Sequence, residues 1–375
     1  MSVGGGEDPS GRRLPVRVMI LSDAIPNRNG VGTYYHDLME HLQENLEHVE
    51  MIPARANCIF KKKRVSIPLP GDNSQHLYLP NVLRILQQVR LERPNVLIAP
   101  TLGPFALLAR ILARRRNLPL IFGYHTSLNK LAGLYWQGHF GRVTSWYLKR
   151  ASRVMFRHAD AVVVNTDAME AEARELGAER VWIMGTTIAR PLMERPEVPY
   201  GGGVQSVLYA GRLAKEKNVT AVAKAAEDLP GMKFTFAGEG PLRQELTRRT
   251  LALANVELTG WLSRGELLDR IDRADVVVLP SEHESFGSIA LEAMARGRLM
   301  LVSENCGILR WPELVKGLCV IREGETVAEA LRRLRALPES ERRAVACAAR
   351  EATRSMNRKT MEGWLDLLES LRGGA

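Results

Sequence analysis

Short apolar runs alternate with longer amphipathic stretches along most of this 375-residue chain, and no other feature limits the fold as much. The runs over residues 96–99 and 276–279 are apolar at every position, as strands are when both faces of a sheet are covered. A helical pattern follows each such run, for example over residues 264–273. Strands that alternate with helices in this way predict parallel sheets covered by helices on both faces.

The apolar runs fall into two series, which predicts two such domains. The first series covers residues 16–21, 96–99, 120–124, 161–164 and 181–184, and the second covers residues 207–210, 233–237, 256–259, 276–279 and 299–302. The stretch between them holds two prolines and three glycines, a composition typical of a linker. We therefore predict an α/β fold of two facing, Rossmann-like, doubly wound domains with a cleft between them. The expected division is a flexible tail over 1–13, an N-terminal domain over 14–194, a hinge over 195–203, a C-terminal domain over 204–350 and a C-terminal helix over 351–375 that packs back on the N-terminal domain.

The composition excludes several classes of protein. The four cysteines include no C-x-x-C pair, so we expect neither a zinc cage nor a disulfide framework. Residues 1–13 contain no apolar run, and no run in the chain approaches the ~20 apolar residues of a membrane span. The sequence G-x-x-x-x-G-K-[ST] is missing, which excludes a P-loop enzyme. We expect a cytoplasmic enzyme.

The net charge of +10 is concentrated in one segment. Residues 51–157 hold 18 lysines and arginines against two acids, Asp72 and Glu92, so the segment carries about +16 and the rest of the chain about −6. Either these charges solvate helix faces and loops, or they meet an anionic partner such as membrane headgroups, nucleic acid or an anionic substrate. Because the aromatic residues of the segment are scattered and no nucleic-acid-binding module is recognisable, we expect no nucleic acid partner.

Ligands of doubly wound domains bind at the carboxyl ends of the strands, so the loops there are the candidate sites. Gly30 and Gly32 follow the first strand and open a helix, where they either bring a ligand close to the backbone or form a plain tight turn. Arg212 and Lys217 follow the first strand of the second domain. Two cations in one loop suit a diphosphate, although either one alone would be interpreted as a surface charge.

Two further loops of the second domain carry candidate residues. Gly238 and Gly240 come just before Pro241, which suits the first turn of a helix, and they would let a ligand approach the backbone. Trp261 follows the next strand and is either the wall of a pocket for a base or a core residue.

The stretch SEHESFGSIALEAMARG over residues 281–297 is the most informative of these loops. We expect its helix to begin near Gly287, so that free N–H groups and the positive end of the helix dipole face the cleft. Glu284 lies just before that helix, and Glu292 lies about one and a half turns into it. Either both are helix-end charges, or they are two separate acceptors, one for the hydroxyls of a sugar ring and one for those of a ribose.

Taken together, these residues resemble the retaining glycosyltransferases of family 4, which have the GT-B fold of two Rossmann-like domains. The resemblance covers residues 16–303 and is strongest in the second domain. Glu284 and Glu292 match the E-x7-E motif of the family, and Arg212 and Lys217 match its pair of cations on the donor diphosphate.

The resemblance also implies roles for single residues. Glu284 would meet the donor sugar and Glu292 the ribose, while the backbone of Ser285, Phe286 and Gly287 would serve the sugar and phosphate. Gly30 and Gly32 match the glycine loop of the first domain, His125 matches a histidine near the reacting sugar, and Trp261 falls where the base is bracketed. Two stretches depart from the family pattern and put ligand detail there in doubt, namely residues 297–299 and residues 305–313.

The resemblance implies that a hexose moves from a nucleotide diphosphate sugar to an acceptor hydroxyl, with retention of the anomeric configuration. Since no D-x-D sequence is present, we expect no metal, and we expect no cofactor besides the nucleotide sugar as co-substrate. The stretch 125–136 is similar to members that act on lipids, which together with segment 51–157 favours a membrane glycolipid precursor as acceptor and peripheral attachment to the inner face of the plasma membrane. A soluble sugar or polysaccharide acceptor, a sugar-nucleotide epimerase and a glycoside phosphorylase stay open as alternatives.

Overall fold

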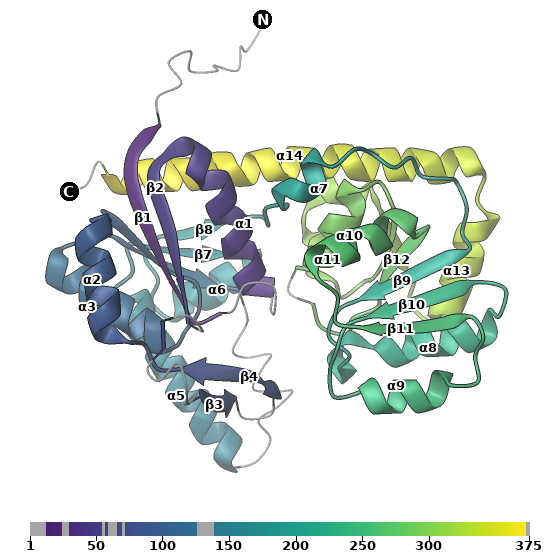
Figure 1. The fold of residues 1–375 in the computed structure, drawn as a ribbon, viewed down its shortest axis with the longest axis horizontal. Coiled ribbons are helices and arrows are strands. Elements are labelled where there is room, and N and C mark those ends of the chain that lie inside the picture. Colours follow the sequence, from purple (N-terminus) through teal and green to yellow (C-terminus); the bar gives the residue numbers. More distant parts are fainter. Residues whose placement is uncertain are drawn as a thin grey trace, which may run out of the picture.

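The protein folds into two domains that lie side by side, with one long helix, α14 (Glu339–Arg372), running across both (Figure 1). The computed structural model describes residues 13–24, 30–54, 57–58, 66–69, 72–125, 139–284 and 286–372. Each domain is built on a six-stranded parallel sheet covered by helices. The predicted α/β fold of two doubly wound domains is confirmed.

The N-terminal sheet separates two hydrophobic cores. Successive side chains of a strand point to opposite faces, so Met19 and Leu21 enter one core while Val18 and Ile20 enter the other. The strands, in spatial order, are β2 (Leu46–Pro53), β1 (Leu14–Ser22), β5 (Val96–Ala99), β6 (Leu120–Tyr124), β7 (Ala161–Val164) and β8 (Val181–Ile183). The first core lies under α2 (Val82–Glu92), α3 (Pro104–Arg116), α5 (His139–Phe156) and α6 (Asp167–Glu175), and the second lies under α1 (Gly30–Asn45) and the end of α14. The strands β3 (Ser66–Leu69) and β4 (Asp72–Tyr78) form a small antiparallel sheet of their own (Figure 1).

The C-terminal sheet is built in the same way. Val276 and Val278 face one core, and Val277 and Leu279 face the other. The strands, in spatial order, are β11 (Val256–Gly260), β10 (Lys233–Ala237), β9 (Ser206–Ala210), β12 (Val276–Leu279), β13 (Leu299–Ser303) and β14 (Leu318–Ile321). One face carries α8 (Val219–Asp228), α9 (Arg243–Thr250) and α13 (Val327–Ala336), and the other carries α7 (Arg190–Glu194), α10 (Arg264–Arg273), α11 (Ser288–Ala295) and α12 (Pro312–Val315).

Arginines of the C-terminal domain hold the segment that connects the two domains. The buried guanidinium of Arg296 donates to the carbonyl oxygens of Arg195 and Pro196 at 3.0 and 2.8 Å. Further carbonyls of the segment accept from Arg298, Arg342 and Arg343. Residues 195–202, which we expected to be part of a hinge, are therefore attached along their length to the C-terminal domain.

Helix α14 joins the domains a second time. It is one continuous helix from Glu339, and residues 351–372, which we expected to form a helix of their own, are its C-terminal part. Its first half packs against α11 and α12, and its end packs on the N-terminal domain, where the indole of the fully buried Trp364 donates to the hydroxyl of Tyr34 at 2.7 Å. Within the described residues, no helix has the length and apolar character needed to cross a bilayer.

Candidate active site

Two loops at the carboxyl ends of neighbouring strands bring the predicted cations and one carboxylate together. Strands β9 and β12 pair directly, so the loop of Arg212 and Lys217 after β9 lies against the loop after β12. The ammonium of Lys217 donates to a carboxylate oxygen of Glu284 at 2.5 Å, and Arg212 pairs with Glu216 at 3.3 Å. Both cations thus already have carboxylate partners, which an incoming anion would have to displace.

Backbone bonds on both sides fix the position of Glu284. The amide of Glu282 donates to the carbonyl of Glu216 at 3.0 Å, and the amide of Gly307 donates to the carbonyl of Glu284 at 3.0 Å. Helix α11 then begins at Ser288, with Gly287 as its N-cap in the left-handed region at φ +97°. A Cβ at Gly287 would lie 2.9 Å from the Leu279 side chain, so only glycine fits. The predicted start of this helix is confirmed.

The other two residues of this loop contribute differently. The side chain of Phe286 is buried and packs edge-on against Trp311, so only its backbone remains for a ligand. Ser285 lies outside the described residues.

Glu292 lies apart from Glu284, in a small cavity between the two domains. The cavity has a volume of about 10 Å³ and is lined by Thr33, Tyr34, Asp37, Thr186, Thr187, Ile188, Ser288, Leu291 and Glu292. Burial raises the pKa of the partly accessible Glu292 to about 7, the positive charge of Arg264 opposes this, and the negative charge of Asp37 adds to it. The two carboxylates therefore serve different places, as the interpretation of two separate acceptors requires.

A second, larger cavity opens beside Glu284. It has a volume of about 340 Å³ and is lined by Glu282, His283, Glu304, Asn305, Cys306, Leu309 and Arg310, at the ends of β12 and β13. This volume falls in the range of small-molecule pockets, ~300–1,000 Å³. Residues 305–310 belong to the stretch that departs from the family pattern, so this chain shapes the cavity with residues of its own.

His125 is buried at the end of β6, and protein groups occupy both of its ring nitrogens. Its Nδ1 donates to Asn165 Oδ1 at 2.6 Å, and its Nε2 lies 2.9 Å from the hydroxyl of Tyr35. Burial lowers the pKa of His125 to about 4, so the ring is neutral at physiological pH. His125 can therefore reach a ligand only if Tyr35 gives up its bond to Nε2.

The remaining predicted residues have different surroundings. A Cβ at Gly238 or Gly240 would lie 1.9 or 2.4 Å from carbonyl oxygens of the loop over 211–213, so close packing of two loops explains both glycines. Gly32 is buried in the first turn of α1, and a Cβ at Gly30 would meet no described atom within 4 Å. Trp261 is 57% exposed, which makes its interpretation as a core residue wrong and leaves a pocket wall as the prediction.

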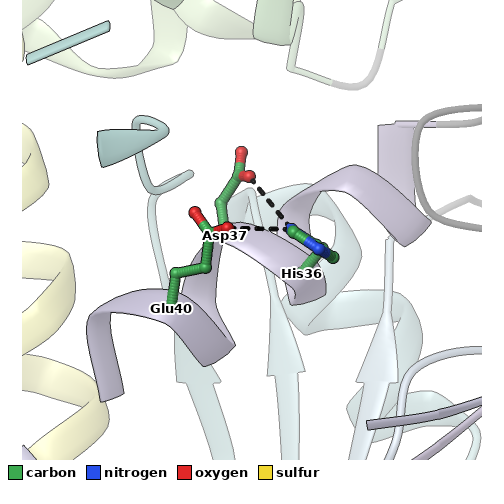
Figure 2. A group of neighbouring side chains, drawn as sticks. All are labelled: His36, Asp37 and Glu40. Carbon is green, nitrogen blue, oxygen red and sulfur yellow. Dashed lines mark ion pairs between the residues drawn. The ribbon is translucent and has the colours of Figure 1, made fainter. Parts of the chain in front are cut away.

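Sequence reasoning missed the ion pair that joins the domains beside Glu292. Arg264 of α10 holds both carboxylate oxygens of Asp37 of α1, each at 2.5 Å. Figure 2 shows that His36 and Glu40 flank Asp37 on α1, with His36 Nδ1 at 3.8 Å from Asp37 Oδ1 and 3.7 Å from Glu40 Oε1. Three such groups have the composition of a cation site, but Arg264 already engages both oxygens of Asp37. The partners are 227 residues apart, and nothing in the sequence near either one indicates the other.

Comparisons with known proteins bear on both halves of the chain. A model described as Glycosyltransferase Family 4 matches residues 28–188, and one described as Glycosyl transferases group 1 matches residues 195–351. The sulfoquinovosyl transferase SQD2 of Arabidopsis thaliana is 24% identical over 80% of this chain and 62% of its own length. A GDP-mannose-dependent phosphatidylinositol dimannoside mannosyltransferase of Mycobacterium tuberculosis is 33% identical over 39% of each chain. This chain therefore spans less than two thirds of the length of either relative.

Solved structures share the architecture. Sucrose-phosphate synthase of Thermosynechococcus elongatus has a TM-score of 0.73 at 17% identity, covering 96% of this chain and 100% of its own. WaaG, a glycosyltransferase involved in lipopolysaccharide biosynthesis, has a TM-score of 0.62 at 16% identity, covering 92% and 99%. The predicted GT-B fold is confirmed by this likeness.

Proposed function

Because this chain belongs to glycosyltransferase family 4, we propose that it is a retaining enzyme that moves a hexose from a nucleotide diphosphate sugar to an acceptor hydroxyl. One observation carries the proposal: Arg212, Lys217 and Glu284 meet in adjoining loops at the carboxyl ends of β9 and β12. Cations and a sugar-binding carboxylate at one point suit a ligand in which a diphosphate adjoins a sugar.

Donor binding would exchange the partners of these groups. The diphosphate takes the place of Glu284 on Lys217, and the freed carboxylate accepts hydrogen bonds from the sugar hydroxyls. Free N–H groups at the start of α11, behind Gly287, add positive potential on the phosphate side. These groups stabilise the charge that grows on the diphosphate as it leaves.

In the transfer step, the bond between the anomeric carbon and the phosphate oxygen breaks, and a bond to the acceptor oxygen forms on the same face of the sugar. The leaving phosphate oxygen takes the acceptor proton, so the step needs no protein base. His125, neutral and held by Asn165, would position a hydroxyl near the sugar rather than transfer a proton.

Donor binding and transfer are tested together. Calorimetric titration with UDP, GDP, ADP, dTDP and CDP, with and without magnesium, should find one nucleotide that binds wild type without metal. With the matching nucleotide sugar, the glycoside product should have the same anomeric configuration, α or β, as the sugar has in the donor. Binding of no nucleotide would overturn the proposal, a product without acceptor would indicate an epimerase, and a dependence on inorganic phosphate would indicate a phosphorylase.

For the acceptor, we propose a glycolipid precursor at an anionic membrane. Helices α2, α3 and α5 lie on the same face of the N-terminal sheet, and their outer sides expose Leu83, Leu107, Ile111, Trp146 and Val154. Exposed arginines accompany them, including Arg84, Arg114, Arg150 and Arg153. Apolar and basic side chains on one face suit a bilayer with anionic headgroups, each nearby cation contributing about 1 kcal/mol.

Vesicle co-sedimentation tests this surface. Wild type should pellet with vesicles that contain phosphatidylglycerol and less with phosphatidylcholine alone, and Trp146→Ala should reduce the bound fraction. Leu251→Ala, which removes an even more exposed apolar side chain from the C-terminal domain, is the control and should behave as wild type. If wild type pellets with neither kind of vesicle, a soluble acceptor becomes the better proposal.

A further inference from the structure

The ion pair between Arg264 and Asp37 is the starting point. Arg264 is the first residue of α10 in the C-terminal domain, and Asp37 lies on α1 in the N-terminal domain. The guanidinium meets the carboxylate as a fork, with both N–O distances at 2.5 Å, and the Asp37 side chain is 4% exposed. Such a bidentate pair is costly to break, because the Asp37 carboxylate alone would be a charge held away from water, although Arg264 is 24% exposed. The pair therefore favours the closed arrangement of the two domains.

The same guanidinium acts on Glu292. Asp37 and Glu292 line one cavity, whose volume of about 10 Å³ holds about one water molecule. Thr187 also lines this cavity, and its hydroxyl, on a residue 3% exposed, has no hydrogen-bond partner in the described residues. The charge of Arg264 thus acts on two carboxylates, one from each domain, that line the same small cavity.

We propose that Arg264 is a positioning residue that couples closure of the two domains to nucleotide binding at Glu292. In the open molecule, Arg264 loses Asp37 and pairs instead with Glu292, which belongs to its own domain. On closure, Asp37 takes both ends of the guanidinium, and Glu292 becomes available to accept hydrogen bonds from ribose hydroxyls. The inference rests on the proposed function, in that it needs a nucleotide at Glu292.

The charged groups around the pair fit this exchange. His36 and Glu40 flank Asp37 on α1 (Figure 2), and both interact with the charge of Arg264. The pKa of His36 is raised, first by its interaction with the Asp37 carboxylate and further by the charge of Glu40. Because both ends of the guanidinium meet Asp37, we expect Asp37 to remain the stronger partner of Arg264 in the closed molecule.

The experiment compares two pairs on the same helix. Arg270 of α10 forms a bidentate pair with Glu257 at 2.6 and 2.7 Å, but both residues belong to the C-terminal domain. Calorimetry on wild type, Asp37→Asn, Arg264→Gln, Arg264→Lys and Arg270→Gln would give the affinity for whichever nucleotide diphosphate wild type binds. Small-angle scattering of the same proteins, with and without that nucleotide, would report domain closure.

We expect Asp37→Asn to weaken nucleotide binding at least tenfold and to enlarge the radius of gyration of the free protein, because its Arg264 remains on Glu292. Arg264→Gln should also enlarge the free protein, because the pair with Asp37 is lost. It should weaken nucleotide binding less than Asp37→Asn does, because no guanidinium is left to compete with the ribose for Glu292. Arg264→Lys, which keeps the charge without the fork, should fall between wild type and Asp37→Asn. Arg270→Gln should match wild type in both measurements.

Two outcomes separate the possible failures. If wild type binds none of the nucleotides, the proposed function fails and this inference fails with it. If wild type binds but Asp37→Asn behaves as Arg270→Gln does, only the inference is overturned. Thermal unfolding of each variant checks that it is folded. If Arg264→Gln does not fold, Arg264→Lys takes its place in the test.

Discussion

The ion pair between Lys217 and Glu284 predicts that substitutions of its two residues change the affinity for a nucleotide diphosphate in opposite directions. Lys217→Ala removes a cation that the donor diphosphate needs. Glu284→Gln removes the carboxylate that competes with the diphosphate for that cation. Nucleotide diphosphate should therefore bind Lys217→Ala more weakly than wild type and Glu284→Gln at least as tightly.

The magnitudes follow from the exposure of the pair. The side chains are 22% and 15% exposed, so water still reaches part of the site. A hydrogen bond to a charged group contributes about 1.5–3 kcal/mol, which corresponds to a loss of about 10- to 150-fold in affinity for Lys217→Ala. The gain for Glu284→Gln should stay under about 1 kcal/mol, or roughly fivefold, because solvent already screens part of the attraction. Transfer should be lost in both variants, since Glu284 is needed by the sugar.

Calorimetric titration with the nucleotide diphosphate that wild type binds separates these outcomes. Lys224→Ala is the matched control, since Lys224 forms an exposed pair with Asp228 at 2.7 Å in the same domain. If Glu284→Gln weakens nucleotide binding as much as Lys217→Ala does, the two residues do not exchange partners, and the reasoning fails.

Three further predictions concern burial. Burial lowers the pKa of His125 from 6.5 to about 4, so between these pH values the unfolded chain binds a proton that the folded protein does not. The free energy of unfolding, measured with urea, should therefore fall as pH drops from 6.5 to 4, and it should fall less in His125→Gln. Because the pKa of Glu292 is about 7, nucleotide affinity measured by calorimetry should weaken as pH falls through 7 in wild type and stay weak at every pH in Glu292→Gln. A Cβ at Gly185 would lie 2.5 Å from Met356 Sδ, whereas one at Gly201 would meet nothing within 4 Å, so Gly185→Ala should cost about 1–3 kcal/mol in thermal unfolding and Gly201→Ala almost nothing.

How far the sequence predicts this fold depends on the position of each strand in its sheet. Interior strands such as β5 and β12 are buried on both faces, so their residues are apolar throughout and the pattern identifies them. Of the four edge strands of the two large sheets, β8 and β11 were predicted from their apolar runs, whereas β2 and β14 were not. Strand β2 reads LEHVEMIP and alternates polar with apolar residues because one edge and part of one face meet solvent.

For the candidate site, the sequence predicts which loops lie together but not which side chains pair within them. Adjacent loops were predictable, because Arg212, Lys217 and Glu284 follow strands that any doubly wound sheet places side by side. Which cation pairs with which carboxylate was not predictable, since it depends on the turn of η1 (Lys215–Lys217) between them. The pairing of Arg264 with Asp37 depends on how two separate domains meet, and neither domain alone encodes it.

The position of the hinge follows from contacts that no composition rule reveals. Prolines and glycines made residues 195–203 the expected hinge, yet arginines of the C-terminal domain hold most of the carbonyls there, so we expect this segment to move with that domain. The chain crosses between domains before it, at residues 184–190, and again in α14, and the two crossings touch where the amide of Ile188 donates to Asn357 Oδ1 at 2.8 Å. A rotation about these adjoining crossings changes the cleft without breaking the bonds of the linker. Because Arg264 and Asp37 lie on different domains, we expect such a rotation to separate them and their pair to oppose opening of the cleft.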